Sequence, residues 1–334
     1  MTTKINLGLI GCGSHSVRSH VVPALRTGRF SIGAIYDPSE ETVALVKNQY
    51  APGAISHASR DSLLDDELVQ ALIIASPDEQ HIDDLWACRD TGHHVLVEKP
   101  IAVDAGGIGM LVALTEVFEG QKRVLTSCHP RRFDPPFRKA REYLPIWIGK
   151  YGDLLSVDFD FFYPQSQTGW KNEGRSLLLD HFGHEIDLLH FLVGHAEISL
   201  RMHHDSPHRY EVVGVRPDDG ITICFRGTRL VPDRDKFPKI YPERLRFRFE
   251  RGDVTIDTHW GKAKVCEHDT MFPYTEGGVW STDYDGRFDA VAHDFADAIE
   301  GNKNPELTAQ DLIANNITGV MLRVNRKYTY KPHV

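Results

Sequence analysis

The chain has 334 residues, 41% of them hydrophobic and 25% charged, a composition typical of a folded protein and a length sufficient for two domains. Its net charge of −9 argues against nucleic acid or an anionic membrane as a partner, and no apolar run reaches the roughly 20 residues of a membrane span. The five cysteines form no C-x-x-C pair and the first residues lead directly into an apolar segment, so we expect a cytoplasmic protein with reduced thiols and no signal peptide.

A glycine-rich turn follows the first predicted strand. Residues 5–10 predict a buried strand, and residues 17–26 predict a helix. Between them, Gly11 permits a tight turn and Gly13 lets the backbone approach a pyrophosphate at the helix N-terminus. Ser16 occupies the third glycine position of the dinucleotide fingerprint, which weakens the motif. The predicted cofactor contacts in this loop are Gly11, Gly13, Ser14 and His15.

An acidic residue ends the second predicted strand, residues 30–36. Asp37 lies 24 residues beyond Gly13, close to the distance expected for the group that binds the adenosine ribose. No lysine or arginine follows until Lys47, so the sequence favours NAD, with NADP as the alternative. Ser39 is also placed to cap the next helix, and both roles are compatible.

The same alternation continues to residue 127. Helices are predicted at 39–50, 78–90 and 104–118, and strands at 71–75, 95–97 and 123–127. Strands that alternate with helices specify a doubly wound parallel sheet. We therefore expect a Rossmann dinucleotide-binding domain at residues 1–127.

The strand at 95–97 ends in Glu98, Lys99 and Pro100. Lysine is seldom buried without a partner, and ligands bind at the carboxyl ends of strands in open α/β sheets. Lys99 is thus either a ligand-facing group or a surface residue at the end of a strand. X-Pro bonds can be cis, and the sequence does not decide the isomer.

The pattern changes after Cys128. Strands with period-two alternation are predicted at 154–163, 211–215, 221–225, 245–249 and 254–259, and helices at 134–143, 287–299 and 309–323. Such alternation indicates a half-buried, mostly antiparallel sheet. We expect an α/β substrate-binding domain at residues 128–334, with its large open sheet joining copies into a homodimer or homotetramer. Residues 203–208 predict a polar loop, and residues 228–241 a surface excursion.

The pattern of residues 177–189 predicts a helix with an apolar face and an adjacent polar face. Its apolar face comprises Leu179, Phe182, Ile186, Leu189 and Val193. Asp180, His184 and Asp187 share an adjacent face, which is either directed into a cleft or solvated. His181, His184 and Asp187 are metal-ligand types, but their spacing is not H-E-x-x-H and no cysteine joins them, so we predict no metal site.

Together these segments resemble the glucose-fructose oxidoreductase / inositol dehydrogenase / rhizopine-catabolism (Gfo/Idh/MocA) family. The similar segments are Gly11-Cys12-Gly13, Ala75-Ser76-Pro77-Asp78 with His81, Glu98-Lys99-Pro100, Arg131-Arg132-Phe133-Asp134-Pro135, and Asp180, His184 and Asp187 in a D-x-x-x-H-x-x-D pattern. Two positions depart from the family: Asp78 replaces its usual asparagine, and Phe182 stands where it usually has glycine.

The resemblance implies a Rossmann domain followed by a domain with a large open sheet, and a dehydrogenase acting on a carbinol of a sugar, polyol or sugar derivative. His184 would be the general base, Lys99 would stabilise the alkoxide, and Asp180 would orient the substrate or Lys99. The further implied cofactor contacts are Ser76, Pro77, His81, Glu98 and Lys99. The substrate contacts would be Arg131, Trp170, Arg175, Asp180 and His184.

Two other functions suit the same fold. One is a sensor that binds a dinucleotide without turnover, although such proteins can lose the lysine or histidine that this sequence retains. The other is an enzyme that keeps its NAD tightly bound, for hydride shuttling between sugars or for glycoside cleavage.

Overall fold

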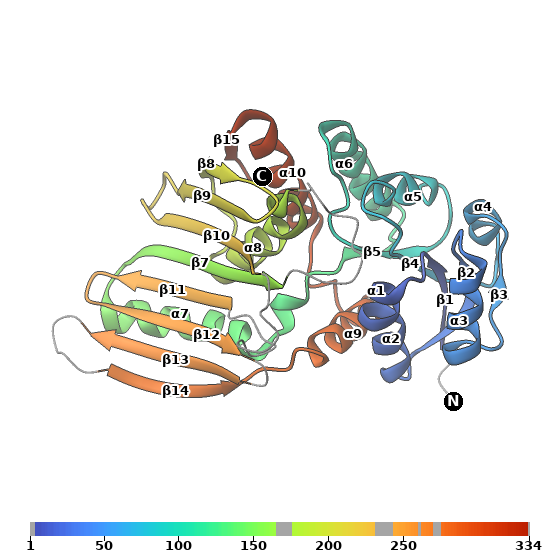
Figure 1. Cartoon of the computed structure of the whole chain (residues 1–334), viewed down its shortest axis with the longest axis horizontal. Helices are drawn as coiled ribbons and strands as arrows, with labels where there is room; N and C mark the ends of the chain where they lie inside the picture. Colours follow the sequence, from blue (N-terminus) through green and yellow to red (C-terminus); the bar gives the residue numbers. More distant parts are fainter. Residues whose placement is uncertain (1–3, 165–175, 231–242, 260–261, 270–274, 333–334) are drawn as a thin grey trace. The chain divides into compact units, whose positions relative to one another are not determined.

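The computed structural model describes residues 4–164, 176–230, 243–259, 262–269 and 275–332 (Figure 1). Contacts within the chain divide it into two compact units. The first unit comprises Met1–Pro130 and Asp285–Ile317, and the second comprises Arg131–Tyr284 and Thr318–Val334. This division differs from the predicted one, because residues 285–317 return to the first unit.

The first unit contains a parallel sheet with the strand order β3-β2-β1-β4-β5-β6 in the described residues, which confirms the predicted Rossmann topology. Its strands are β1 (Ile5–Ile10), β2 (Phe30–Tyr36), β3 (Ile55–Ser56), β4 (Ala71–Ile74), β5 (His94–Val97) and β6 (Leu125–Ser127). Its helices include α1 (Ser14–Ser16), the π-helical segment η1 (Val17–Val21), α2 (Val22–Arg26), α3 (Glu40–Tyr50), α4 (Arg60–Leu64), α5 (His81–Ala87), α6 (Ala105–Gly120) and α9 (Gly286–Ile299).

Local sequence explains the helix starts in this unit. The Ser39 hydroxyl accepts the Thr42 N–H at 3.2 Å, which confirms the predicted cap of α3. Asp104 caps α6 by accepting the Gly107 N–H at 2.8 Å. This cap offsets part of the poor helix propensity of a first turn that contains two glycines.

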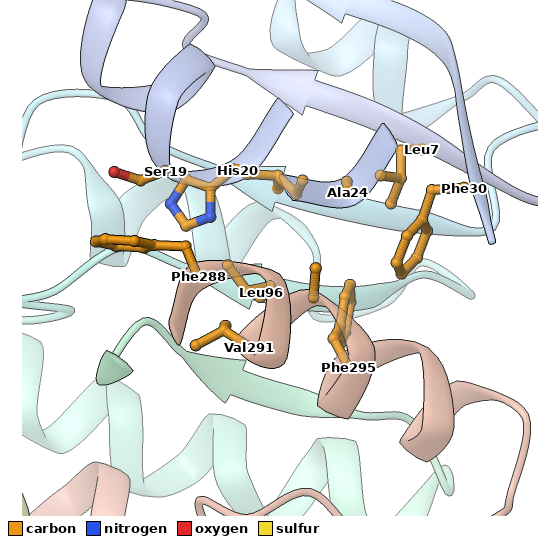
Figure 2. A pocket seen from close by; sticks show the side chains of 11 residues that line it. Leu7, Ser19, His20, Ala24, Phe30, Leu96, Phe288, Val291 and Phe295 are labelled. Carbon is orange, nitrogen blue, oxygen red and sulfur yellow. The ribbon is translucent and has the colours of Figure 1, made fainter. Parts of the chain in front are cut away.

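Helix α9 belongs to the first unit because it packs on the β1 side of the parallel sheet. Phe295 of α9 stacks on Phe30 with ring centroids 6.2 Å apart, and Arg29 pairs with Asp297 and Glu300. Figure 2 shows the apolar pocket that remains at this junction. It is lined by Leu7, Ser19, His20, Ala24, Phe30, Ile73, Leu96, Phe288, Val291, Ala292 and Phe295.

The second unit contains a sheet whose described strands run in the order β14-β13-β12-β11-β7-β10-β9-β8-β15. They are β7 (Leu154–Pro164), β8 (Ile198–Asp205), β9 (Arg209–Val215), β10 (Thr222–Leu230), β11 (Glu243–Phe249), β12 (Gly252–His259), β13 (Lys262–Asp269), β14 (Thr275–Ser281) and β15 (Lys327–Tyr330). β7 and β10 pair in parallel, and the other described pairs are antiparallel, as the sequence predicts.

Two long helices, α7 (Pro135–Tyr151) and α8 (Leu177–Val193), pack on this sheet, and α10 (Ala309–Asn325) contributes to both units. Their apolar side chains form one core with inward residues of the strands, among them Phe159, Phe225 and Phe247. The prediction of a polar loop at 203–208 is wrong in its first half, because β8 extends to Asp205. No helix in the described parts of the chain is both long and apolar enough to cross a membrane.

The outward positions of the same strands include a row of charged side chains. One row across six neighbouring strands alternates in sign, and its members are Lys264, Asp257, Arg244, Asp160, Arg226 and Glu211. Within this row, Arg244 pairs with Asp257 and Arg226 with Asp160, each at 2.6 Å. Ion pairs therefore cross the middle of this face, which also carries exposed apolar side chains such as Val215 and Val279.

Candidate active site

The glycine loop lies between β1 and α1. Gly11 has φ +82°, and an added Cβ would lie 2.6 Å from the Ala75 carbonyl, so only glycine fits this turn. Gly13 caps α1, and an added Cβ there would meet nothing within 4 Å. Ser14 and His15 form the first helical turn. The open space at Gly13 and the N–H groups of the helix start suit the pyrophosphate of NAD or NADP.

Asp37 connects this loop to the end of β2. Its Oδ2 accepts the Cys12 N–H, and its Oδ1 accepts the Ser39 N–H, both at 2.9 Å. A carboxylate can accept about four hydrogen bonds, so lone pairs remain for ribose hydroxyls. Asp37 therefore lies beside the glycine loop at the end of β2, and its contact with the ribose stays a prediction.

Glu98 is buried at the carboxyl end of β5, where its carboxylate contacts three other groups. Its Oε1 lies 2.9 Å from His15 Nε2 and 2.7 Å from His20 Nε2, and its Oε2 accepts the Lys99 backbone N–H at 3.0 Å. Burial alone would raise the pKa of the Glu98 carboxyl, but the two histidines outweigh it and hold that pKa well below its usual range. Glu98 is therefore an ionised carboxylate that binds two elements of the unit together.

The segment after Glu98 is held on several sides. The Lys99-Pro100 bond is cis. His81 bridges two loops, with Nδ1 2.8 Å from the Pro100 carbonyl and Nε2 2.7 Å from the Ser76 carbonyl. The Asn316 side-chain oxygen, from α10, accepts the backbone N–H groups of the two residues that follow Pro100, at 2.8 and 3.2 Å. The backbone that carries Lys99 is thus fixed by groups from distant parts of the sequence.

Ser76 and Pro77 follow β4, at the same edge of the sheet. The Ser76 hydroxyl donates to Asp84 Oδ2 at 2.6 Å, and Arg60 pairs with the other oxygen of Asp84 at 3.1 Å. Pro77 is exposed. The loop thus has a fixed backbone beside Gly11, and its predicted contact with the cofactor stays a prediction.

In the second unit, α8 carries Asp180 and His184, and both side chains are buried. Asp180 Oδ2 pairs with Arg229 Nη2 of β10 at 2.9 Å. The His184 ring lies against His181, with centroids 6.5 Å apart, and His181 in turn stacks on Tyr163 at 3.7 Å. Sequence reasoning missed Arg229, because only the pairing of β10 beside α8 identifies it as the partner of Asp180.

The other side of α8 is anchored in the core. Arg132 Nε lies 2.9 Å from both carboxylate oxygens of Asp187, and both residues are buried. The Tyr163 hydroxyl donates to Glu185 at 2.7 Å, and burial raises the pKa of Glu185 to about 7. Asp187, although it belongs to the D-x-x-x-H-x-x-D pattern, is thus an anchor of the helix.

Of the three predicted substrate contacts outside α8, the structure describes one. Arg131 is only 5% exposed, and its guanidinium donates to Glu243 Oε1 at 2.6 and 3.0 Å. Its charge is thus already neutralised within the unit. Trp170 and Arg175 lie outside the described residues.

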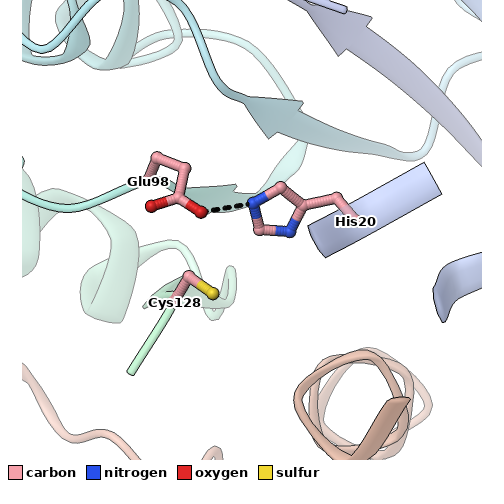
Figure 3. A group of neighbouring side chains, drawn as sticks. All are labelled: His20, Glu98 and Cys128. Atoms are coloured by element: carbon pink, nitrogen blue, oxygen red, sulfur yellow. Dashed lines mark hydrogen bonds and ion pairs between the residues drawn. The ribbon is translucent and has the colours of Figure 1, made fainter. Parts of the chain in front are cut away.

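His20, Glu98 and Cys128 form a buried group of metal-ligand types, with one atom of each within 4.8 Å of the others (Figure 3). The 2.7 Å between His20 Nε2 and Glu98 Oε1 is a hydrogen-bond distance. It is shorter than the roughly 3.3 Å between two ligand atoms of a tetrahedral zinc site. Burial and Glu98 also raise the pKa of the Cys128 thiol, which favours the protonated form over a metal-binding thiolate.

The predicted catalytic residues are divided between the units. Lys99 lies in the first, whereas Asp180 and His184 lie in the second. Each group has a defined local environment, and their meeting over one substrate stays a prediction.

Comparisons with known proteins agree with the topology. Residues 5–127 match the model of an oxidoreductase family with an NAD-binding Rossmann fold. An inositol 2-dehydrogenase of Saccharopolyspora erythraea is 29% identical over 216 residues, which cover 64% of this chain and 60% of that protein. One of Paenarthrobacter aurescens is 27% identical over 213 residues, covering 63% and 60%. The chain thus matches about 60% of the length of these curated relatives.

Solved structures match over almost the whole chain. KijD10, a 3-ketoreductase from Actinomadura kijaniata solved with NADP and TDP-benzene, aligns over 96% of this chain and 98% of its own, with a TM-score of 0.78 and 17% identity. An oxidoreductase from Thermotoga maritima aligns over 98% of both chains, with a TM-score of 0.77 and 18% identity. These structures show the fold. Residues 5–127 thus form the NAD-binding Rossmann domain of the Gfo/Idh/MocA oxidoreductase family, and the chain as a whole has the fold of these solved oxidoreductases.

Proposed function

We propose that the chain is an NAD-dependent dehydrogenase that acts on a carbinol of a sugar, polyol or sugar derivative, or reduces the corresponding carbonyl. The observation that carries this proposal is Lys99, whose backbone is fixed at the carboxyl end of β5 within an NAD-binding Rossmann unit. The polyol class is supported by the inositol 2-dehydrogenases among the relatives, which the chain matches over part of their length.

The cofactor site would use groups that the first unit already presents. Gly13 and the start of the helical segment would hold the pyrophosphate, and Asp37 the adenosine ribose. When bound, the nicotinamide supplies the hydride acceptor or donor. The carboxylate of Asp37, which would repel a 2′-phosphate, supports NAD over NADP.

The proton chemistry would fall to this chain's own side chains. His184 would take the proton of the reacting hydroxyl, because imidazole titrates near neutrality. Lys99 would donate a hydrogen bond to the same oxygen and stabilise its developing negative charge. Asp180, held by Arg229 at 2.9 Å, would orient the substrate or Lys99.

The test is a panel of sugars, inositols and nucleotide-sugars, each with NAD and with NADP, followed at the nicotinamide absorbance. With an active substrate, Lys99→Ala should lower kcat by about a thousandfold or more and leave NAD binding, measured by calorimetry, nearly unchanged. Lys47→Ala, on α3, is the matched control. Near-normal turnover in Lys99→Ala would refute the assignment, and an absorbance scan after dialysis would reveal a cofactor that the enzyme retains.

The outward face of the second sheet supports a further part of the proposal, that a second copy covers it. Its charges alternate in sign from strand to strand, so a copy rotated by a two-fold axis can place cations opposite carboxylates. Arg244→Glu with Arg226→Glu should shift the wild-type assembly towards monomers in sedimentation velocity. A wild-type monomer at micromolar concentration would contradict this assembly.

A further inference from the structure

The helical segment after the glycine loop contains one π-helical turn. In η1, the Val22 N–H donates to the Val17 carbonyl five residues earlier, whereas α1 before it and α2 after it are α-helical. A π-turn of this kind places residues five apart about one turn from each other. In an α-helix, residues five apart point about 140° away from each other around the axis.

This turn brings two imidazoles, five residues apart, to one carboxylate oxygen. His15 Nε2 and His20 Nε2 lie 2.9 and 2.7 Å from Glu98 Oε1, and the two rings meet edge to face with centroids 6.4 Å apart. His20 is 3% exposed and Glu98 5%. A regular α-helix would direct one of the two histidines away from Glu98.

The opposite oxygen of the same carboxylate reaches the proposed catalytic lysine. Glu98 Oε2 accepts the backbone N–H of Lys99 at 3.0 Å. One oxygen therefore binds the first helical segment and the other binds the backbone of Lys99. Any rotation of the Glu98 carboxylate must break contacts at both ends.

We propose that His20 and His15 are positioning residues, which hold the Glu98 carboxylate in the orientation that fixes the Lys99 backbone. The inference rests on the proposed function, in which Lys99 acts on the substrate oxygen. It assigns a role to His20, which no motif identified, and a second role to His15, which the sequence predicts only as a cofactor contact.

Two variants separate positioning from packing. His20→Leu keeps apolar bulk and removes the N–H donor, so kcat should fall about tenfold or more, since small misplacements of a catalytic group cost up to about a hundredfold. His20→Gln keeps an N–H donor and should recover most of kcat. The KM for NAD should change less than about threefold in either variant, because His20 lies outside the glycine loop and is not among the predicted cofactor contacts.

The matched control is the other histidine–carboxylate pair of the first unit, His57 with Asp66 at 3.2 Å. His57→Leu should leave kcat unchanged. If His20→Leu and His57→Leu both keep wild-type kcat, the positioning role is overturned while the proposed function stands. If His20→Gln fails to recover kcat, the histidine serves packing and not donation.

A measurement that needs no turnover keeps this inference separate from the proposed function. Amide hydrogen exchange at Lys99, followed by NMR, reports directly on the bond from its N–H to Glu98. Exchange should be at least tenfold faster in His20→Leu than in the wild type, and unchanged in His57→Leu. Unaltered exchange in His20→Leu would overturn the positioning role, even for a protein that oxidises none of the substrates tested.

Discussion

The pair formed by Arg132 and Asp187 allows a sharp test of what the second aspartate of the D-x-x-x-H-x-x-D pattern does. Arg132 Nε lies 2.9 Å from each carboxylate oxygen, and an Nη2 contact at 2.8 Å completes the pair. The side chains are 5% and 0% exposed. Asp187→Ala would therefore remove a carboxylate that contacts this buried guanidinium at three distances of 2.8 to 2.9 Å.

Breaking a buried pair from one side costs about 3–5 kcal/mol, because the remaining charge stays desolvated. For a unit of this size, each kcal/mol lowers the unfolding midpoint by about 2–4 °C. We therefore expect Asp187→Ala to lower the midpoint of the second unit by about 6–20 °C. Replacing both partners, as Arg132→Met with Asp187→Leu, should recover most of this loss.

Tryptophan fluorescence during thermal unfolding is a suitable assay, because Trp147 and Trp280 stack within the second unit with centroids 6.4 Å apart. The exposed pair of Lys331 and Glu197 provides the control, and Glu197→Gln should change stability by less than about 0.5 kcal/mol. If Asp187→Ala kept the wild-type midpoint but lost turnover, Asp187 would be a reacting group and the anchoring role would be refuted.

Three further predictions concern single sites. Gly13→Ala should fold normally but bind NAD at least tenfold more weakly, whereas Gly11→Ala should lower the melting temperature, because its Cβ would meet backbone at 2.6 Å. The folded pKa of Glu185, about 7, exceeds its ordinary 4.5, so the folded state binds the extra proton and stability falls as pH rises from 4.5 to 7. Glu185→Gln should be more stable than the wild type at pH 8, by roughly 3 kcal/mol, and lose that advantage near pH 5 in calorimetry. Arg229→Met should lower kcat at least tenfold by removing the cation that holds Asp180 Oδ2, and an unchanged kcat would show that this pair does not position Asp180.

The first sheet was predictable because each of its central strands is buried on both faces. Residues 71–74 and 94–97 are short apolar runs between helical segments, and both became parallel strands. The edges of the second sheet gave a weaker signal. β8, which lies next to the edge strand β15, ends in His203, His204 and Asp205, which indicate a loop by composition although His204 and Asp205 pair with β9. A strand at the polar margin of a sheet is identified by its neighbour, which a single sequence does not supply.

In the candidate site, too, some residues are predictable from a short local motif, whereas their partners lie far away in the sequence. Lys99, Asp180 and His184 are predicted site residues because each lies in a short motif at the end of a strand or on one helix face. The residues that hold these segments in place through hydrogen bonds or ion pairs have no such local signal. Asn316 lies 215 residues beyond the Ile101 amide that it binds. Arg229 lies 49 residues beyond Asp180. No local pattern connects such positions.

The histidines of the first helical segment show a different limit, because the periodicity itself is what changes. The sequence places His15 in the glycine loop and His20 on a predicted helix over residues 17–26, and at 100° per residue two side chains five apart on one α-helix would point in different directions. The single π-turn adds one residue to the helix and reverses that conclusion, so that both rings meet Glu98. π-turns are frequent at functional sites, and this one brings His15 and His20 to the carboxylate that binds the Lys99 backbone, which supports the proposed positioning role. Where a glycine loop leads into a helix that contains a π-turn, side chains five residues apart can therefore contact the same group.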